Sequence, residues 1–239
     1  MNKRIALISD HASPLVSPGS IDNGGQNIYV KELAIELAEQ GCIVDIYTRW
    51  ENASFPQVLK LGNNIRLIHI EAGPKKYIPK EELLAFKDVF ANNMIELINL
   101  SDKPYDVVHA NFFISAYVAM QIKKELSIPY VITFHALGKI RRLHQGGNDL
   151  FPEERIEIEQ QAIDLADAII AECIQDKQDL IEHYDVPLDK ISIIPCGVNT
   201  KTFYNTGKSF SRARLGIASD DFVILQLGRM VPRKGIDNV

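Results

Sequence analysis

The feature that most constrains the fold of this sequence is a repeated alternation between short apolar runs and segments of helical periodicity. The first run, 4–9, is apolar almost throughout, as expected for a strand that a parallel sheet buries on both faces. After a loop, apolar residues recur at helical spacing from Val30 to Ala38, and Gly41 ends the segment. Such alternation favours parallel strands joined by right-handed helical crossovers.

The same alternation continues through most of the chain. Strands are predicted over 43–48, 65–70, 105–109, 130–134, 168–171 and 191–194. Helices are predicted over 81–100, 115–126, 153–166 and 175–183. We therefore predict an α/β fold with a Rossmann-like parallel sheet and helices on both faces.

A polar stretch near 199–209 interrupts this pattern. Beyond it come a short helix-like segment, 212–215, and an apolar run, 222–227, that predicts a new strand. We therefore expect one domain over 1–205 and the start of a second domain over 206–239.

Charge and cysteine content exclude several classes of protein. The net charge of −5 argues against a nucleic-acid binder, because such domains are basic. Cys42, Cys173 and Cys196 form no Cys-x-x-Cys pair, which is poor for zinc or a disulfide framework and predicts a cytoplasmic protein. No run approaches about 18 apolar residues, so no transmembrane segment is expected. The first apolar run is too short for a signal peptide.

Three histidines follow predicted strands. In an open parallel sheet, ligands bind at the carboxyl ends of the strands, and His11, His109 and His135 each fall there, with Asn111 close behind His109. This repetition favours a shared cleft. A metal site is the rival interpretation, but no i, i+4 pair or carboxylate cluster supports it. We therefore expect no metal.

A basic patch follows His135. It consists of Lys139, Arg141, Arg142 and His144. A solvated surface and a site for an anionic ligand are both compatible with such a patch, and the sequence leaves the two open.

Two glycines, Gly24 and Gly25, precede the first predicted helix. They would let the backbone approach a phosphate, which the helix N-terminus attracts, although a tight turn has the same signature. Gly-x-Gly-x-x-Gly is absent, which disfavours a nicotinamide-dependent oxidoreductase.

Two cations lie near the end of the chain, in the string Gly228-Arg229 followed by Lys234-Gly235. Arginine binds oxyanions in a fork and lysine acts as a point charge. Their spacing on a predicted strand-to-helix turn suits a pyrophosphate.

Four segments together carry a resemblance to a known family: 24–30 (GGQNIYV), 134–139 (FHALGK), 194–199 (IPCGVN) and 228–235 (GRMVPRKG). Their order and spacing resemble family 4 retaining glycosyltransferases of the GT-B fold, in the sucrose-phosphate synthase-like and D-inositol-3-phosphate glycosyltransferase branch. The resemblance runs over essentially the whole chain. It identifies the chain as a GT-B N-terminal domain with the first strand of a second domain.

The resemblance implies a nucleotide-diphosphate sugar as donor substrate, UDP-glucose or similar, with no cofactor and no metal. Gly24, Gly25 and Asn27 would bind the donor. Arg229 and Lys234 would neutralise its diphosphate as the leaving group. His135 would bind a hydroxyl of the transferred sugar or, through its carbonyl, stabilise positive charge at the anomeric carbon.

The resemblance also implies acceptor-side residues. Lys80 and Arg155 match positions that hold an acceptor phosphate in one branch, whereas Phe112 and Ala136 lack the hydroxyls expected there. The acceptor would be a sugar or a sugar phosphate. The candidate acceptor residues are His11, Lys80, His109, Asn111, Lys139, Arg142 and Arg155.

The family's Glu-x₇-Glu segment, which holds the donor sugar and ribose, would lie beyond Val239, with about 150 further residues. We therefore expect little or no activity from this chain alone. A non-catalytic module that binds a sugar phosphate or a partner stays an alternative. A GT-B-like epimerase would need a pair of carboxylates poised at the sugar, and the candidate loop residues include no such pair. The oligomeric state stays open.

Overall fold

The computed structural model describes residues 2–15 and 24–228. The chain divides into two compact units, residues 1–196 and 197–239, whereas the sequence placed the division between 205 and 206.

The described part of the first unit contains an eight-stranded sheet in the order β3-β4-β2-β1-β5-β6-β7-β8. All neighbouring strands are parallel except β3 and β4, which confirms the predicted fold class. The strands are β1 (Arg4–Ile8), β2 (Ile43–Arg49), β3 (Val58–Gly62), β4 (Ile65–Ile70), β5 (Val107–Asn111), β6 (Tyr130–Thr133), β7 (Ala168–Ala171) and β8 (Ile191–Ile193).

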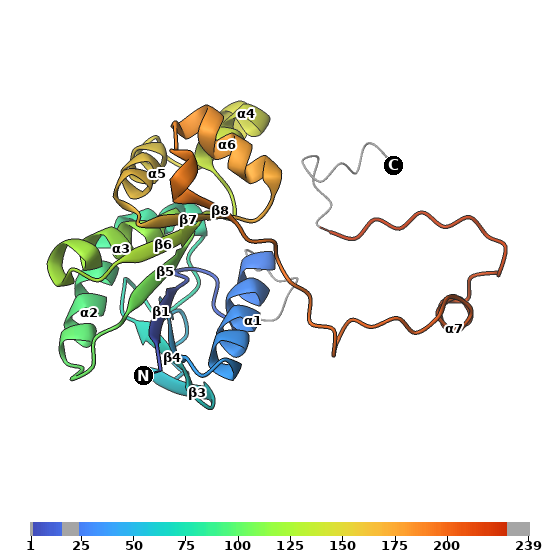
Figure 1. Cartoon of the computed structure of the whole chain (residues 1–239), viewed down its shortest axis with the longest axis horizontal. Helices are drawn as coiled ribbons and strands as arrows, with labels where there is room; N and C mark the ends of the chain where they lie inside the picture. Colours follow the sequence, from blue (N-terminus) through green and yellow to red (C-terminus); the bar gives the residue numbers. More distant parts are fainter. Residues whose placement is uncertain (1, 16–23, 229–239) are drawn as a thin grey trace. The chain divides into compact units, whose positions relative to one another are not determined.

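Helices cover both faces of the sheet (Figure 1). Those of the first unit are α1 (Gly25–Glu39), α2 (Lys87–Asn99), α3 (Phe113–Leu126), α4 (Gly138–Gln145), α5 (Glu154–Leu165) and α6 (Ile174–Tyr184), with 3₁₀ turns η1 (Lys80–Phe86), η2 (Gly146–Asn148) and η3 (Leu188–Lys190). The second unit contains α7 (Lys208–Leu215).

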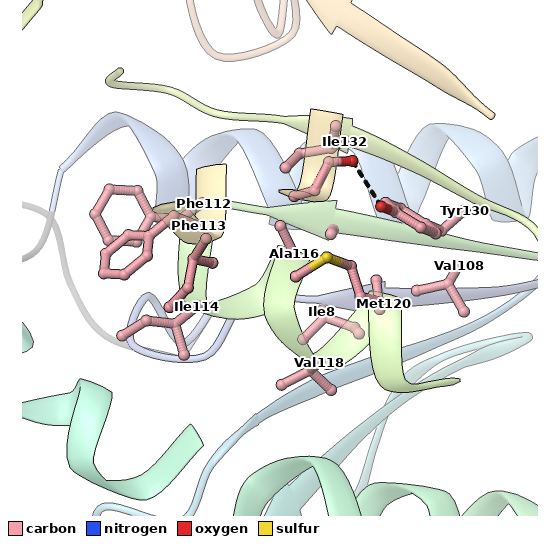
Figure 2. Close-up of a cluster of buried hydrophobic side chains, with 14 of the residues drawn as sticks. Ile8, Val108, Phe112, Phe113, Ile114, Ala116, Val118, Met120, Tyr130 and Ile132 are labelled. Carbon is pink, nitrogen blue, oxygen red and sulfur yellow. Dashed lines mark hydrogen bonds between the residues drawn. The ribbon is translucent and has the colours of Figure 1, made fainter. Parts of the chain in front are cut away.

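The alternation of side chains along β1 shows why both faces need cover. Leu7 packs in a cluster with Val30 and Ala34 of α1. Its neighbours Ala6 and Ile8 face the other way, into the larger cluster that includes residues of α2, α3 and α5. Figure 2 shows part of that larger cluster, where the buried Tyr130 hydroxyl donates to the Ala162 carbonyl at 2.6 Å.

Three local differences from the sequence prediction have simple causes. Strand β3 was not predicted, because it is a largely exposed edge strand without a continuous apolar run. Helix α4 was read only as a basic patch, because charged residues obscure its periodicity. The helix predicted over 81–100 begins as the 3₁₀ turn η1 and becomes α-helical at Lys87.

The segment 222–227 also differs from the prediction, because it forms no strand among the described residues. A strand requires a partner for its backbone hydrogen bonds. This segment takes part in no strand pairing among the described residues, and its apolar side chains stay exposed, Phe222 by 90% and Leu227 by 92%.

Candidate active site at the carboxyl edge of the sheet

Polar residues from three neighbouring parallel strands meet at the carboxyl edge of the sheet. Asn111 ends β5, His135 follows β6, and Glu172 follows β7. The Asn111 Oδ1 atom lies 3.0 Å from His135 Nε2, and Asn111 Nδ2 donates to the Ile8 carbonyl of β1 at 3.2 Å. Asn111 and His135 lie close together because parallel strands end at a common edge.

His135 has an unusual backbone and two side-chain partners. Its φ of 58° lies in the left-handed region, which costs a non-glycine residue about 1–3 kcal/mol. Its Nε2 faces Asn111, and its Nδ1 lies 3.1 Å from Glu172 Oε1. The ring of Tyr29 packs edge-on against it, with centroids 4.9 Å apart. The surroundings therefore fix both the turn and the ring.

Glu172 is the carboxylate of this cluster. Burial alone would raise its pKa, but the hydrogen bond and charge of His135 and the hydrogen bond from Cys196 hold the pKa below its usual value. The Cys196 thiol donates to Glu172 Oε1 at 3.1 Å. Burial and this carboxylate raise the pKa of Cys196 to about 12, so Cys196 stays a protonated thiol and a poor nucleophile.

His109 is a buried residue of β5 near His135. Its Nε2 is 2.9 Å from the hydroxyl oxygen of Thr133 on β6. Burial, aided by the neighbouring His135, lowers the pKa of His109 to about 3. His109 is therefore neutral at physiological pH.

His11 is oriented by the residue before it. Its Nδ1 lies 3.1 Å from Asp10 Oδ2, and the Ser115 hydroxyl at the start of α3 donates to Asp10 Oδ1 at 2.6 Å. Its ring lies 4.8 Å from that of Phe112. Because the carboxylate only accepts, Nδ1 of His11 donates to it.

The glycine pair occupies the start of α1, with Gly24 as its N-cap and Gly25 as its first residue. A β-carbon added at either glycine would meet no described atom within 4 Å. Asn27 accepts from Gly24 N at 3.0 Å and donates to the Ser13 carbonyl at 2.8 Å. Asn27 therefore links the start of α1 to Ser13 at the helix N-terminus, which is the position predicted for a phosphate.

Three of the predicted cations have partners within the protein rather than at His135. Lys139 donates to the His183 carbonyl at 2.5 Å, Arg142 pairs with Glu153 at 2.5 Å, and Lys80 lies 3.5 Å from Glu81. The patch after His135 thus contributes largely to contacts of α4 with its neighbours.

Arg155 lies in an aromatic cage. Its Nε donates to Glu159 Oε1 at 2.8 Å and its Nη2 to the Ala136 carbonyl at 2.5 Å. Its Cζ lies 5.0, 4.9 and 4.5 Å from the ring centroids of Phe112, Phe113 and Phe151. Nη1 is buried without a hydrogen-bond partner among the described residues.

An open pocket of about 700 Å³ lies beside this region. The pocket is lined by the apolar side chains of Leu84 and Phe86 from η1 and of Pro152. The charged residues Lys87 and Glu154 also line it. Lys87 and Glu154 pair at 3.1 Å. The pocket is roomy enough for a small polar molecule.

The predictions on the terminal cations, on metal binding and on membrane spans concern features other than this cluster. Arg229 and Lys234 fall outside the described residues, so their placement stays a prediction. Within 2–15 and 24–228, no group of three histidine, cysteine or acidic side chains is arranged to hold a metal ion. None of the helices in the described part of the chain could span a membrane.

The candidate site residues from the sequence do not include Asp10 and Glu172, the two carboxylates that orient histidines. Each follows a predicted strand directly, so the position was informative. The pairing of these carboxylates with histidines could not be predicted from the sequence, because it depends on contacts between strands.

Comparison with known proteins gives consistent matches. The family model for glycosyltransferase family 4 matches residues 23–202. The chain is 35% identical over 237 residues to a D-inositol 3-phosphate glycosyltransferase of Corynebacterium glutamicum, covering 97% of this chain and 56% of the relative. It is 36% identical over 239 residues to the protein of that name from Corynebacterium diphtheriae, with 98% and 56% covered.

Two solved structures also match this chain. A sucrose-phosphate synthase from Thermosynechococcus elongatus matches with a TM-score of 0.88 and 31% identity, over 99% of this chain and 58% of that one. The Anabaena protein Alr3699/HepE, solved in complex with UDP-glucose, matches with a TM-score of 0.64 and 15% identity, over 98% and 55%. The second match concerns the fold alone. The chain spans about 56% of the length of the curated relatives it matches.

Proposed function

This chain belongs to glycosyltransferase family 4, and on that premise we propose that it is part of a retaining enzyme that moves a hexosyl group. The donor is a nucleotide-diphosphate sugar, with UDP-glucose as the first candidate, and the acceptor is a sugar or a sugar phosphate. The chain supplies the acceptor side and part of the donor site.

The observation that carries this proposal is the carboxyl-edge cluster of Asn111, His135 and Glu172. Ligands of open parallel sheets bind at this edge. The N-terminus of α1 adds a helix end whose dipole attracts a diphosphate, and a β-carbon at Gly24 or Gly25 would meet no described atom within 4 Å.

His135 acts through its main chain in this proposal. Both ring nitrogens already face protein acceptors, whereas no described residue donates to its carbonyl oxygen. A carbonyl dipole beside the anomeric carbon stabilises the positive charge that develops as the bond to the diphosphate breaks. Arg229 and Lys234 neutralise the leaving diphosphate, so no metal or cofactor is needed.

Arg155 supports an anionic acceptor, because its buried Nη1 lacks a partner among the described residues. An unpaired buried donor of this kind is costly and calls for an acceptor. We therefore propose that the acceptor phosphate, when there is one, binds near Arg155 and Lys80.

The test uses the full-length protein with UDP-glucose and three competing acceptors: fructose 6-phosphate, inositol phosphate and glucose. Mass spectrometry identifies the product, and NMR gives its anomeric configuration. We expect an α-linked product and a preference for a phosphorylated acceptor. An inverted linkage would refute retention, and equal use of the three acceptors would refute a phosphate site.

A second assay separates an enzyme from a binding module. We propose that residues 1–239 alone have little or no activity and gain it when the remainder of the protein is added in trans. Binding of a sugar phosphate without any turnover in the full-length protein would favour the non-catalytic module instead.

We also propose a cytoplasmic location, since Cys42, Cys173 and Cys196 are free thiols and a reducing compartment keeps thiols in that state. Cell fractionation checks this. Recovery of the native protein outside the cytoplasm would contradict it.

A further inference from the structure

We propose that Glu172 is a positioning residue for His135, whose imidazole it clamps together with Asn111 so that both ring nitrogens carry a proton. This deepens the function proposed above, because it concerns the same site. Glu172 acts through His135 and need not touch a substrate.

The Asn111 side of the clamp is fixed by a neighbouring strand. Asn111 Nδ2 donates to the Ile8 carbonyl at 3.2 Å and lies 3.4 Å from the His109 carbonyl. The amide can satisfy these carbonyls only with its nitrogen turned toward them. Its Oδ1 therefore faces His135 as an acceptor, at 3.0 Å, and Nε2 of the ring must donate.

The Glu172 side also presents only an acceptor. Glu172 Oε1 lies 3.1 Å from His135 Nδ1, and its own backbone N–H donates to Asp176 Oδ2 at 3.0 Å, which anchors the residue at the start of α6. A carboxylate has no proton to donate, so Nδ1 of the ring must donate as well. A ring that donates from both nitrogens is an imidazolium paired with Glu172.

The other titratable groups around the ring are neutral. Tyr29 of α1 has a pKa raised by burial, and His109 of β5 has a pKa lowered to about 3 by burial. The Cys196 thiol, with a pKa raised to about 12 by burial and Glu172, donates to the same carboxylate oxygen. Glu172 is therefore the charged group in contact with His135.

Burial makes this pair more than a surface contact. The side chains of His135 and Glu172 are 11% and 20% exposed, so solvent screens them less than an exposed pair. The clamp holds the ring, and with it the left-handed turn at φ 58° that sets the direction of the His135 carbonyl. Loss of Glu172 would free the ring on one side.

The test is a nitrogen-15 NMR measurement on histidine-labelled chain 1–239 at pH 7, where ring nitrogens report whether each carries a proton. A H135Q sample assigns the signals. Wild-type protein is expected to show two protonated nitrogens at His135, and E172Q only one, because the neutral amide no longer stabilises the charge. E182Q is the matched control, since Glu182 is an exposed glutamate on α6, and it should match wild type.

Two outcomes would overturn the proposal: a single ring proton in wild-type protein, or the same two protons in E172Q. The wild-type measurement alone decides the first outcome, so the test survives even if E172Q folds poorly. E172D, which restores the charge at a shorter reach, should recover part of the second proton signal.

A kinetic readout in the full-length protein complements the spectra. E172Q is expected to lower kcat by about 10- to 100-fold, the range for a misplaced catalytic group, with KM for the donor changed far less. Unchanged kcat would remove the positioning role. Absence of any transferase activity in wild-type protein would refute the proposed function and leave the NMR result standing.

Discussion

The guanidinium of Arg155 donates from Nε to Glu159 Oε1 across 2.8 Å, where the two side chains are 2% and 0% exposed. The same carboxylate accepts the Gly138 N–H, with its two oxygens at 3.1 and 2.9 Å, and the hydroxyl of Tyr184. Glu159 therefore connects α4, α5 and α6. Arg155 extends the network to the Ala136 carbonyl, one residue beyond His135.

Replacement of Glu159 should be strongly destabilising. In E159Q the buried Arg155 loses its counter-charge, and removing one partner of a buried pair costs about 3–5 kcal/mol. Urea unfolding of chain 1–239 measures the loss. E157Q on the exposed face of the same helix should stay within about 0.5 kcal/mol of wild type. Equal stability of the two variants would mean that the network contributes little to the free energy of unfolding.

Gly138 should tolerate no side chain. A β-carbon there would meet Glu159 Oε2 at 2.8 Å and Arg155 Nε at 3.1 Å. G138A is therefore expected to lose about 1–3 kcal/mol, as in other overpacked sites. G147A serves as the control, because a β-carbon at Gly147 meets nothing within 4 Å. Thermal melts that rank G147A below G138A would contradict this packing.

Gly25 should matter for binding rather than for stability. A β-carbon there meets no described atom, so G25A should melt like wild type. The added methyl would occupy the space through which a diphosphate approaches the N–H groups of α1. Calorimetric titration of the full-length protein with UDP should show at least about tenfold weaker binding, worth about 1.4 kcal/mol. An unchanged affinity would place the diphosphate elsewhere.

Asp45 should give the fold an acid-sensitive contribution. Burial favours its neutral form, but hydrogen bonds from Arg66 at 2.7 and 2.6 Å and from Tyr105 outweigh this and lower the pKa of Asp45. A lowered folded pKa means that the stabilisation is present above the unfolded value of about 3.9 and disappears as the pH falls through the folded pKa.

The variant D45N isolates that contribution. At pH 7 it should be less stable than wild type by about 1.5–3 kcal/mol, as expected for hydrogen bonds to a charged group. The difference should shrink below about pH 3.9. Urea unfolding at pH 7, 4 and 3 measures it, and a gap that widens on acidification would show the sign to be wrong.

His109 should act in a different pH window. Its pKa is lowered to about 3 by burial, against about 6.5 in the unfolded chain. Between these values the unfolded state binds the extra proton, so wild type loses about 1.4 kcal/mol per pH unit as the pH falls. H109Q lacks this proton uptake. Its stability relative to wild type should therefore improve from pH 7 to pH 5, and a constant difference would show that folding leaves the pKa of His109 unshifted.

The sequence by itself determined the fold class and the edge at which the site lies. Apolar runs such as 4–9 and 130–134 could be buried on both faces only in a covered parallel sheet, and β1 and β6 lie there. Parallel strands end at one edge, so the positions of His11, His109 and His135 at the ends of predicted strands indicated this edge as the candidate cleft. The sequence did not predict helix α4 and edge strand β3, because charge and exposure weaken the hydrophobic periodicity of these segments.

Tertiary structure decided which polar groups pair. Glu172 reaches His135, and Glu159 reaches Gly138, Arg155 and Tyr184, although these partners are scattered along the chain. Lys139 and Arg142 turn to the His183 carbonyl and to Glu153. The physical reason is that periodicity fixes which face of an element is buried. The partner of a buried charge depends instead on the register and packing of neighbouring elements, which exist only once the chain has folded.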